Sequence, residues 1–292
     1  MNIILFDDST IRQNLLPFTF TRPVAEIRVG ILTIAEKWRE FMGEAVSYLT
    51  QPYLQDKFSL YFDTRNVYIN GAICPDEEIV AAIRDLKIGE ALYHQGMLLA
   101  INGDNLELHD LEELVNYAST KMVECDSCTI IRDVWEIFQF NGQQIRSDFA
   151  LITQGRQSQP VGDRHSIVYN EENIFIEEGV KIRAAILNAE NGPIYLGKNA
   201  QVHEGAVIRG PFALGEESHV NVGGKMRGDV TIGPFCKVGG EVAASVIFGY
   251  TNKGHEGYLG NSVLGEWCNI GADTNTSNLK NNYAEVKIWN YA

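Results

Sequence analysis

The stretch that decides the fold of the C-terminal half is LGKNAQVHEGAVIRGPFALGEESHVNVGGKMRGDVTIGPFCKV, residues 196–238. Every sixth residue in it is apolar, from Leu196 to Val238, and small or apolar residues recur four places after several of these. An α-helix needs a period near 3.6 and an ordinary strand a period of about 2, so neither element alone explains the spacing. The spacing predicts a triangular coil whose sides are short strands, each with one apolar side chain pointing inward. Stacked coils of this kind form a solenoid.

The same six-residue spacing continues on both sides of this stretch. Apolar residues fall on it upstream at Ile176 and Ile182, and downstream at Leu264 and Ile270. The pattern resembles the hexapeptide repeat of left-handed parallel β-helices. The resemblance implies an all-β left-handed parallel β-helix as the C-terminal domain. Because many members of that family are acyltransferases that work as trimers and use a thioester donor, it also implies a homotrimer.

The composition of the 292-residue chain limits its partners, since its net charge is −14 at pH 7. Binding to nucleic acid needs a basic face, so nucleic acid is excluded as a general partner, whereas a phosphorylated small molecule needs only a local cationic cluster. No stretch reaches the roughly 18 consecutive apolar residues of a membrane span, and the start of the chain lacks the features of a signal peptide. We therefore expect a cytoplasmic protein with no membrane partner.

The five cysteines are scattered and do not suggest a disulfide framework. Cys125 and Cys128 form a C-x-x-C motif, which has neither the second pair of a zinc site nor the βαβ setting of a redox site. Cys236 and Cys268 fall on small inward positions of the repeat, so we interpret them as core residues. The sequence leaves the ligands of any metal unknown.

The first 154 residues show another pattern, in which apolar segments with strand character alternate with segments of helical spacing. Strands are expected at residues 2–6, 67–69 and 91–101, and helices at residues 27–42, 75–83, 106–117 and 133–144. Such alternation predicts an α/β, Rossmann-like domain with a largely parallel sheet. We expect residues 155–173 to be a linker and the β-helix to occupy residues 174–292.

An insert interrupts the repeat between Val238 and Leu264, and its sequence is FGYTNKGHEGYLGNS, residues 248–262. It carries Lys253 and His255, and CNIGADTNTSN follows at residues 268–278. Neutral imidazole is a natural base near pH 7 for taking a proton from an ammonium group. Backbone N–H groups or an Asn side chain can stabilise a tetrahedral oxyanion, and Arg or Lys can bind a phosphate. Acetyl transfer to an amino-sugar phosphate requires these residue types.

The insert and the residues after it resemble the acetyltransferase site of bacterial N-acetylglucosamine-1-phosphate uridylyltransferase/glucosamine-1-phosphate acetyltransferase. The positions of that motif match here without a gap at His255, Tyr258, Asn269, Ala272 and Asn278. The resemblance implies that His255 is the general base and that Asn278 orients the histidine or the acyl group. It further implies that Tyr258 and Asn269 bind the sugar phosphate and that Ala272 belongs to the acetyl-CoA site.

Upstream, Lys225-Met226-Arg227 resembles the basic pair of the same family, which implies that Arg227 binds the phosphate. The family also has a lysine pair before its catalytic loop, where this chain has residues 243–245, Ala-Ala-Ser. Lys253 is the expected replacement for the missing phosphate ligand. The family has a tyrosine where this chain has Leu279, and it continues for several coils that complete the coenzyme A site. This chain is therefore either a fragment or a form without full acyltransferase activity.

The start of the chain resembles the opening of the sugar nucleotidyltransferase superfamily, in which a G-x-G-T-R-M loop is followed by a proline-lysine pair. Arg12 corresponds to the loop arginine and Arg22 to the lysine. The family's loop glycines are replaced by the sequence Asp-Asp-Ser at residues 7–9. Asn70 stands near the place of the usual metal-binding aspartate, so the ligand of Mg²⁺ is either Asn70 or a residue elsewhere. Asp7 and Asp8 are either metal ligands or part of a solvated loop, and we favour the loop.

Together these resemblances imply a bifunctional enzyme of UDP-N-acetylglucosamine biosynthesis. It would acetylate glucosamine-1-phosphate from acetyl-CoA and transfer uridylyl from UTP to N-acetylglucosamine-1-phosphate, with Mg²⁺. One alternative is a sugar-1-phosphate nucleotidyltransferase whose β-helix serves only oligomerisation or regulation. A second alternative is a sugar-nucleotide-binding assembly protein without catalysis, in which His255 lies in a surface loop of no function.

Overall fold

The computed structural model describes residues 2–103, 106–118, 122–125, 128–276 and 278–291. The chain forms two compact units. The first contains Met1–Ile27, Leu32–Val134 and Asn290–Ala292, and the second contains Arg28–Ile31 and Trp135–Trp289.

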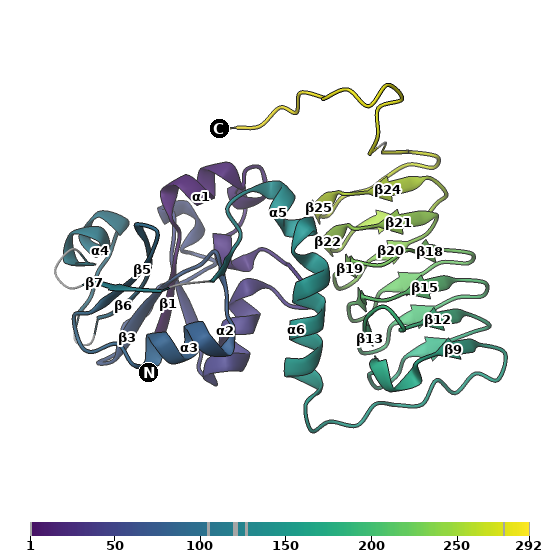
Figure 1. Ribbon diagram of the computed structural model, residues 1–292, viewed down its shortest axis with the longest axis horizontal. Coiled ribbons are helices and arrows are strands. Elements are labelled where there is room, and N and C mark those ends of the chain that lie inside the picture. Colours follow the sequence, from purple (N-terminus) through teal and green to yellow (C-terminus); the bar gives the residue numbers. More distant parts are fainter. Residues whose placement is uncertain (1, 104–105, 119–121, 126–127, 277, 292) are drawn as a thin grey trace. The chain divides into compact units, whose positions relative to one another are not determined.

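The described part of the first unit contains a six-stranded mixed sheet with the strand order β2-β1-β3-β6-β5-β7 (Figure 1). Its strands are β1 (Asn2–Phe6), β2 (Val46–Leu49), β3 (Asn66–Asn70), β5 (Ala91–His94), β6 (Met97–Asn102) and β7 (Met122–Glu124). Strand β1 pairs in parallel with both β2 and β3, and its apolar side chains are buried. A separate small sheet pairs β4 (Ile73–Cys74) with β8 (Thr129–Ile130).

The expectation of a largely parallel sheet is wrong at β6, an interior strand that runs antiparallel to both of its neighbours. The segment expected to be one strand is a hairpin, in which β5 and β6 pair antiparallel and β6 also runs antiparallel to β3. The chain reverses at Gln95 and Gly96, whose φ angles are 50° and 79°. Two successive residues with positive φ form the tight turn that suits the twist of a hairpin.

Helices surround this sheet, and their ends carry recognisable caps. They are α1 (Ser9–Asn14), α2 (Ile34–Met42), α3 (Glu77–Arg84) and α4 (Leu111–Ala118), with short 3₁₀ turns at Phe18–Phe20, Val24–Glu26 and Pro52–Leu54. Thr33 and Glu36 form a reciprocal capping box at the start of α2, and Gly43 ends that helix with a left-handed φ of 68°. The expected helix at 27–42 therefore begins only at the capping threonine.

The second unit contains a parallel β-solenoid, as the six-residue spacing predicted, and its strands are stacked in Figure 1. Its three faces, within the residues that the structure describes, are sheets of six, five and six strands. The first face is β10 (Ile174–Ile176), β13 (Ile194–Leu196), β16 (Phe212–Leu214), β19 (Val230–Ile232), β22 (Val246–Gly249) and β25 (Val263–Glu266). The second is β11 (Lys181–Ile182), β14 (Gln201–Val202), β17 (His219–Val220), β20 (Lys237–Val238) and β23 (Asn252–Lys253). The third is β9 (Ile167–Tyr169), β12 (Ile186–Asn188), β15 (Val207–Arg209), β18 (Lys225–Met226), β21 (Glu241–Ala243) and β24 (Tyr258–Gly260).

The six-residue positions fill the inside of the solenoid. One buried cluster contains every member of the series from Leu196 to Val238. Cys236 belongs to the same cluster, as expected for a small inward residue. Burial of this apolar column is the main force that holds coil upon coil, because each coil alone has no core.

Aromatic side chains stack along one corner of the solenoid. The ring of Tyr250 lies between those of Phe235 and Trp267, with centroid distances of 5.2 Å and 4.8 Å. All three residues have positive φ, at 56°, 51° and 60°. Bulky residues rarely adopt this conformation, and the stacking contacts offset part of its cost.

Helix α6 (Asn141–Thr153) and all but the first residue of helix α5 (Val134–Gln139) belong to the second unit, and α6 packs on β16 and β19. The segment Arg28–Ile31 lies in this unit too. The N–H of Gly30 donates to Asn141 Oδ1 at 2.8 Å, and the N–H of Ile31 donates to Asp148 Oδ2 at 2.8 Å. The Thr231 hydroxyl lies 2.9 Å from Gly30 O and 3.0 Å from Asn141 Oδ1. We call this buried network the clasp.

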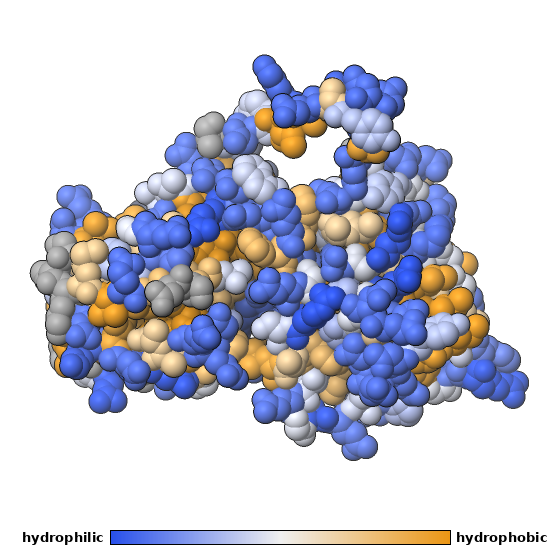
Figure 2. Space-filling view, in the orientation of Figure 1, coloured by the Kyte–Doolittle hydropathy of each residue, from blue (hydrophilic) through white to orange (hydrophobic). Residues whose placement is uncertain are grey.

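The surface agrees with the polar composition. Most of the face shown in Figure 2 is hydrophilic, with smaller apolar patches between the polar side chains. Among the described residues, no helix is long and apolar enough to cross a membrane.

Candidate functional sites

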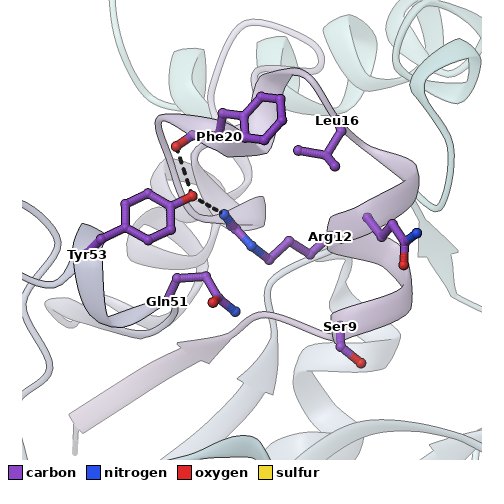
Figure 3. Close-up of a pocket in the computed structure, with 7 residues that line it drawn as sticks. Ser9, Arg12, Leu16, Phe20, Gln51 and Tyr53 are labelled. Carbon is purple, nitrogen blue, oxygen red and sulfur yellow. Dashed lines mark hydrogen bonds between the residues drawn. The ribbon is translucent and has the colours of Figure 1, made fainter. Parts of the chain in front are cut away.

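A pocket lies in the first unit, beyond the carboxyl ends of β1 and β2. Its volume is about 310 Å³, and it is lined by Ser9, Arg12, Gln13, Leu16, Phe20, Gln51 and Tyr53 (Figure 3). In parallel α/β sheets, ligands bind at this edge, where loops follow the strand ends. The lining is mainly neutral, with aromatic and amide side chains that suit a ring rather than a chain of phosphates.

Arg12 reaches this pocket but is held by the protein. The residue is 8% exposed, and its Nη1 donates to Asp7 Oδ2 at 3.1 Å. Its Nη2 donates to the Thr19 carbonyl and to the Tyr53 hydroxyl, the latter at 2.7 Å (Figure 3). Arg12 thus fixes the loop after α1 and one wall of the pocket in this conformation.

The other N-terminal candidates are also buried. Arg22 is 9% exposed, and its carbonyl oxygen lies 3.4 Å from Arg12 Nη1. Asn70 is inaccessible at the end of β3, where its amide donates to Leu98 O and its Oδ1 accepts from the Ala72 N–H. The structure brings Arg12 and Arg22 together but gives Asn70 a structural position.

Our preference for a solvated loop at Asp7 and Asp8 is wrong. Asp7 is buried and accepts hydrogen bonds from the Val24 N–H, the Thr50 hydroxyl and Arg12. Burial raises the pKa of Asp7, and these donors oppose the rise. Asp8 caps α1, since its Oδ1 accepts from the N–H groups of Thr10 and Ile11. Helix α1 therefore begins directly after Asp8.

These bonds bear on metal binding. Mg²⁺ prefers carboxylate oxygens that keep room for water and substrate phosphates. The oxygens of Asp7 and Asn70 already accept from the protein, so these two residues do not fit the role of Mg²⁺ ligands. No group of three His, Cys, Asp or Glu side chains suited to a metal occurs in the described part of the chain.

The second candidate site is a turn of the solenoid, residues 254–257, between β23 and β24. His255 is exposed at the outside of this turn. Gly257 has a φ of 122°, and a side chain there would meet the Thr274 carbonyl of the next coil. The N–H of Asp273 donates to Glu256 O at 2.9 Å, so the turn 271–274, which contains Ala272, lies directly against the turn of His255.

The other motif residues gather partly around this turn. The amide of Asn278 donates to the Tyr258 hydroxyl at 3.0 Å, which joins two predicted site residues directly. Asn269 Oδ1 accepts from Asn252 at 2.9 Å, on the second face of the solenoid. Ser277, which belongs to the same motif, lies outside the described residues.

Arg227 lies on the third face, two coils from Tyr258. Its Nη1 forms an ion pair with Glu241 at 2.7 Å, and Glu241 is the strand neighbour of Tyr258. This hydrogen bond from Arg227 raises the arginine's pKa. Sequence reasoning missed Glu241, as well as the ion pair of 3.5 Å between Lys225 and Glu256. Register between coils decides both pairs, and the six-residue pattern alone does not show it.

Lys253 does not occupy the place of an exposed phosphate ligand, so that expectation is wrong. The side chain is 1% exposed, and its Nζ donates to the His255 carbonyl at 2.7 Å. Its strand position is the register partner of Val238, which points into the core. The lysine therefore points inward, behind the turn that carries His255.

The fold defines the chain as an α/β unit with a pocket beyond the ends of β1 and β2, followed by a parallel β-solenoid. The family model described as sugar nucleotidyl transferase matches residues 3–157, more than half of the chain. The chain belongs to this family and is a transferase. No curated protein matches the sequence significantly.

Proposed function

We propose that the protein is a bifunctional sugar-phosphate enzyme, whose first activity is transfer of a nucleotidyl group to a sugar 1-phosphate. The match to the sugar nucleotidyl transferase family carries this part. The pocket at the ends of β1 and β2 supports it, because Phe20 and Tyr53 offer aromatic surface and Gln13 and Gln51 offer amides for a base. UTP is the proposed donor and N-acetylglucosamine-1-phosphate the proposed acceptor.

In that reaction, a phosphate oxygen of the sugar attacks the α-phosphorus of UTP, and pyrophosphate leaves. Arg12 and the loop it fixes would shape the donor side of the pocket. Mg²⁺ bound to the triphosphate is part of the proposal, but Asp7 and Asn70 do not fit as its ligands, so no step is assigned through the ion. The test is UTP-dependent release of pyrophosphate, together with its loss in Gln51→Ala. Full release in that variant would move the reaction away from this pocket.

The second proposed activity is acetyl transfer at the turn 254–257. The observation that favours it is the hydrogen bond between Tyr258 and Asn278, two residues of the predicted site; His255, three residues before Tyr258, is exposed. Neutral His255 would take a proton from the amino group of glucosamine-1-phosphate as the nitrogen attacks the thioester carbon of acetyl-CoA. The carbon–sulfur bond then breaks, the amide forms, and the leaving thiolate takes the proton from His255, so that coenzyme A leaves as the thiol and His255 is neutral again.

The roles of the remaining residues are those that the resemblance implies. Tyr258, Asn269 and Arg227 would bind the sugar phosphate, Asn278 would orient the histidine or the acyl group, and Ala272 would belong to the acetyl-CoA site. A homotrimer is part of the proposal, and the mass of the protein in solution tests it. Release of thiol from acetyl-CoA in the presence of glucosamine-1-phosphate tests the activity. His255→Ala should abolish this release and leave the number of subunits in the oligomer unchanged. Retained release in that variant would exclude His255 as the base.

A further inference from the structure

The last inward residue on the second face of the solenoid is charged, whereas the others on that face are apolar. The inward residues of the second face, from β11 to β23, are in register with one another. They are Ile182, Val202, Val220, Val238 and Lys253. A lysine therefore stands at the end of a column of branched apolar side chains, in a strand that directly precedes the turn of His255.

This position is unfavourable for a charge. Lys253 is 1% exposed, and burial lowers the pKa of its ammonium, while Glu256 acts in the opposite direction. Removing an ammonium group from water is unfavourable unless hydrogen-bond or charged partners compensate for the lost hydration. A valine or methionine there would pack in the column without this cost. The lysine thus needs an explanation other than the stability of the core.

The partner of the ammonium supplies that explanation. Every carbonyl oxygen from residue 253 to residue 257 accepts a hydrogen bond from a group outside its own peptide. The donors are Gly239 N to Lys253 O, Asn221 Nδ2 to Gly254 O, Lys253 Nζ to His255 O, Asp273 N to Glu256 O and Glu241 N to Gly257 O. Only the His255 carbonyl in this series has a charged donor, and charge-assisted hydrogen bonds are about twice as strong as neutral ones.

We propose that Lys253 is a positioning residue for His255. The buried ammonium of Lys253 fixes the peptide plane after the histidine and therefore the direction of the imidazole. The inference rests on the proposed acetyl transfer at this turn. Fixing a carbonyl restricts the dihedral angles on both sides of it, and a general base must stand within hydrogen-bond reach of its proton. A displacement of about 1 Å can cost on the order of 100-fold in rate.

The test compares Lys253→Met with Lys237→Met. Methionine keeps the length of the side chain and removes the donor from the His255 carbonyl. Lys237 is exposed on the preceding coil, where it is the register partner of Asn252, so its substitution controls for loss of a lysine from this face. Both variants should keep the melting temperature of the wild type or exceed it.

In Lys253→Met, we expect kcat for acetyl transfer to fall on the order of tenfold, with KM for glucosamine-1-phosphate within about twofold of the wild type. Lys237→Met should keep both constants. A second readout needs no activity: cleavage after Glu256 by a glutamate-specific protease should be several-fold faster in Lys253→Met, because local opening exposes the turn.

The outcomes separate the two proposals. Wild-type kcat or an unchanged rate of cleavage after Glu256 in Lys253→Met overturns the positioning role. A fall in kcat that accompanies a lower melting temperature also overturns it, because the lysine would then support the fold in general. Absence of acetyl transfer in the wild type removes the proposed acetyltransferase function, while the cleavage rates still decide whether Lys253 holds the turn.

Discussion

The clasp around Asn141 gives the sharpest prediction of stability. Asn141 is fully buried, and its amide oxygen accepts the Gly30 N–H while its nitrogen donates to Asp229 O at 2.9 Å. In Asn141→Ala, the buried Gly30 N–H loses its acceptor, which costs about 1–3 kcal/mol, and loss of the partly buried bond to Asp229 adds about 1 kcal/mol. We expect the second unit to lose about 3 kcal/mol of its free energy of unfolding.

Thr231→Val provides a graded comparison, because it keeps the shape of the side chain and removes only the shared hydroxyl. Its expected cost is about 1 kcal/mol. Hydrogen exchange followed by mass spectrometry on peptides that span residues 28–31 and 141–153 isolates this unit. Exchange in Asn141→Ala should accelerate about 100-fold, and in Thr231→Val about fivefold. An Asn141→Ala variant that exchanges no faster than Thr231→Val would refute the network as described.

Further predictions concern protonation and packing in the solenoid. Burial, together with the charges of His203 and Lys237, lowers the pKa of His219 below 6.5, and Glu217 acts in the opposite direction. Because the unfolded chain then binds a proton at a higher pH than the folded chain does, the free energy of unfolding falls as the pH drops below about 6.5. Urea titrations at pH 7 and pH 5 should show a smaller loss of unfolding free energy in His219→Gln than in the wild type. An equal loss in the two proteins would argue against the role of His219. Because the pKa of Lys253 is lowered in the folded protein, the wild type should become more stable as the pH rises towards 10.5. Curves of stability against pH that run parallel for the wild type and Lys253→Met would contradict this. Gly257→Ala combines an unfavourable φ with a clash against Thr274 O and should cost about 3 kcal/mol of stability. Gly43→Ala also has a positive φ but has open space around it, so it should cost about 1 kcal/mol. Similar melting temperatures of the two variants would disprove the difference.

The solenoid was predictable because one physical rule, an inward apolar residue on each side of each coil, repeats over a long stretch. The direction of Lys253 was hidden by a change in spacing. Inward residues of the second face recur at Val202, Val220 and Val238, and the next comes at Lys253, three residues early. The segment 250–253, Tyr-Thr-Asn-Lys, repeats the corner pattern of 235–238, Phe-Cys-Lys-Val, and that comparison would have found it.

The N-terminal pocket was less predictable. Gln51 and Tyr53 follow β2, a strand that the sequence pattern did not reveal, and they meet α1 only through the fold. Arg12 was identified by its position in a motif, but its burial against Asp7 depends on contacts from distant parts of the chain. Motif reasoning finds residue types, whereas hydrogen-bond partners of buried charges require the three-dimensional arrangement.

The stack of Phe235, Tyr250 and Trp267 also gives the solenoid an optical signal that depends on how its coils are stacked. The indole of Trp267 lies face to face with the phenol ring of Tyr250, from the preceding coil, at an interplanar angle of 10°. Coupled aromatic transitions in a fixed chiral arrangement give near-ultraviolet circular dichroism, which disappears when the coils separate. The last coils can therefore be followed optically during refolding with no added dye, as the part of the signal that Trp267→Leu removes.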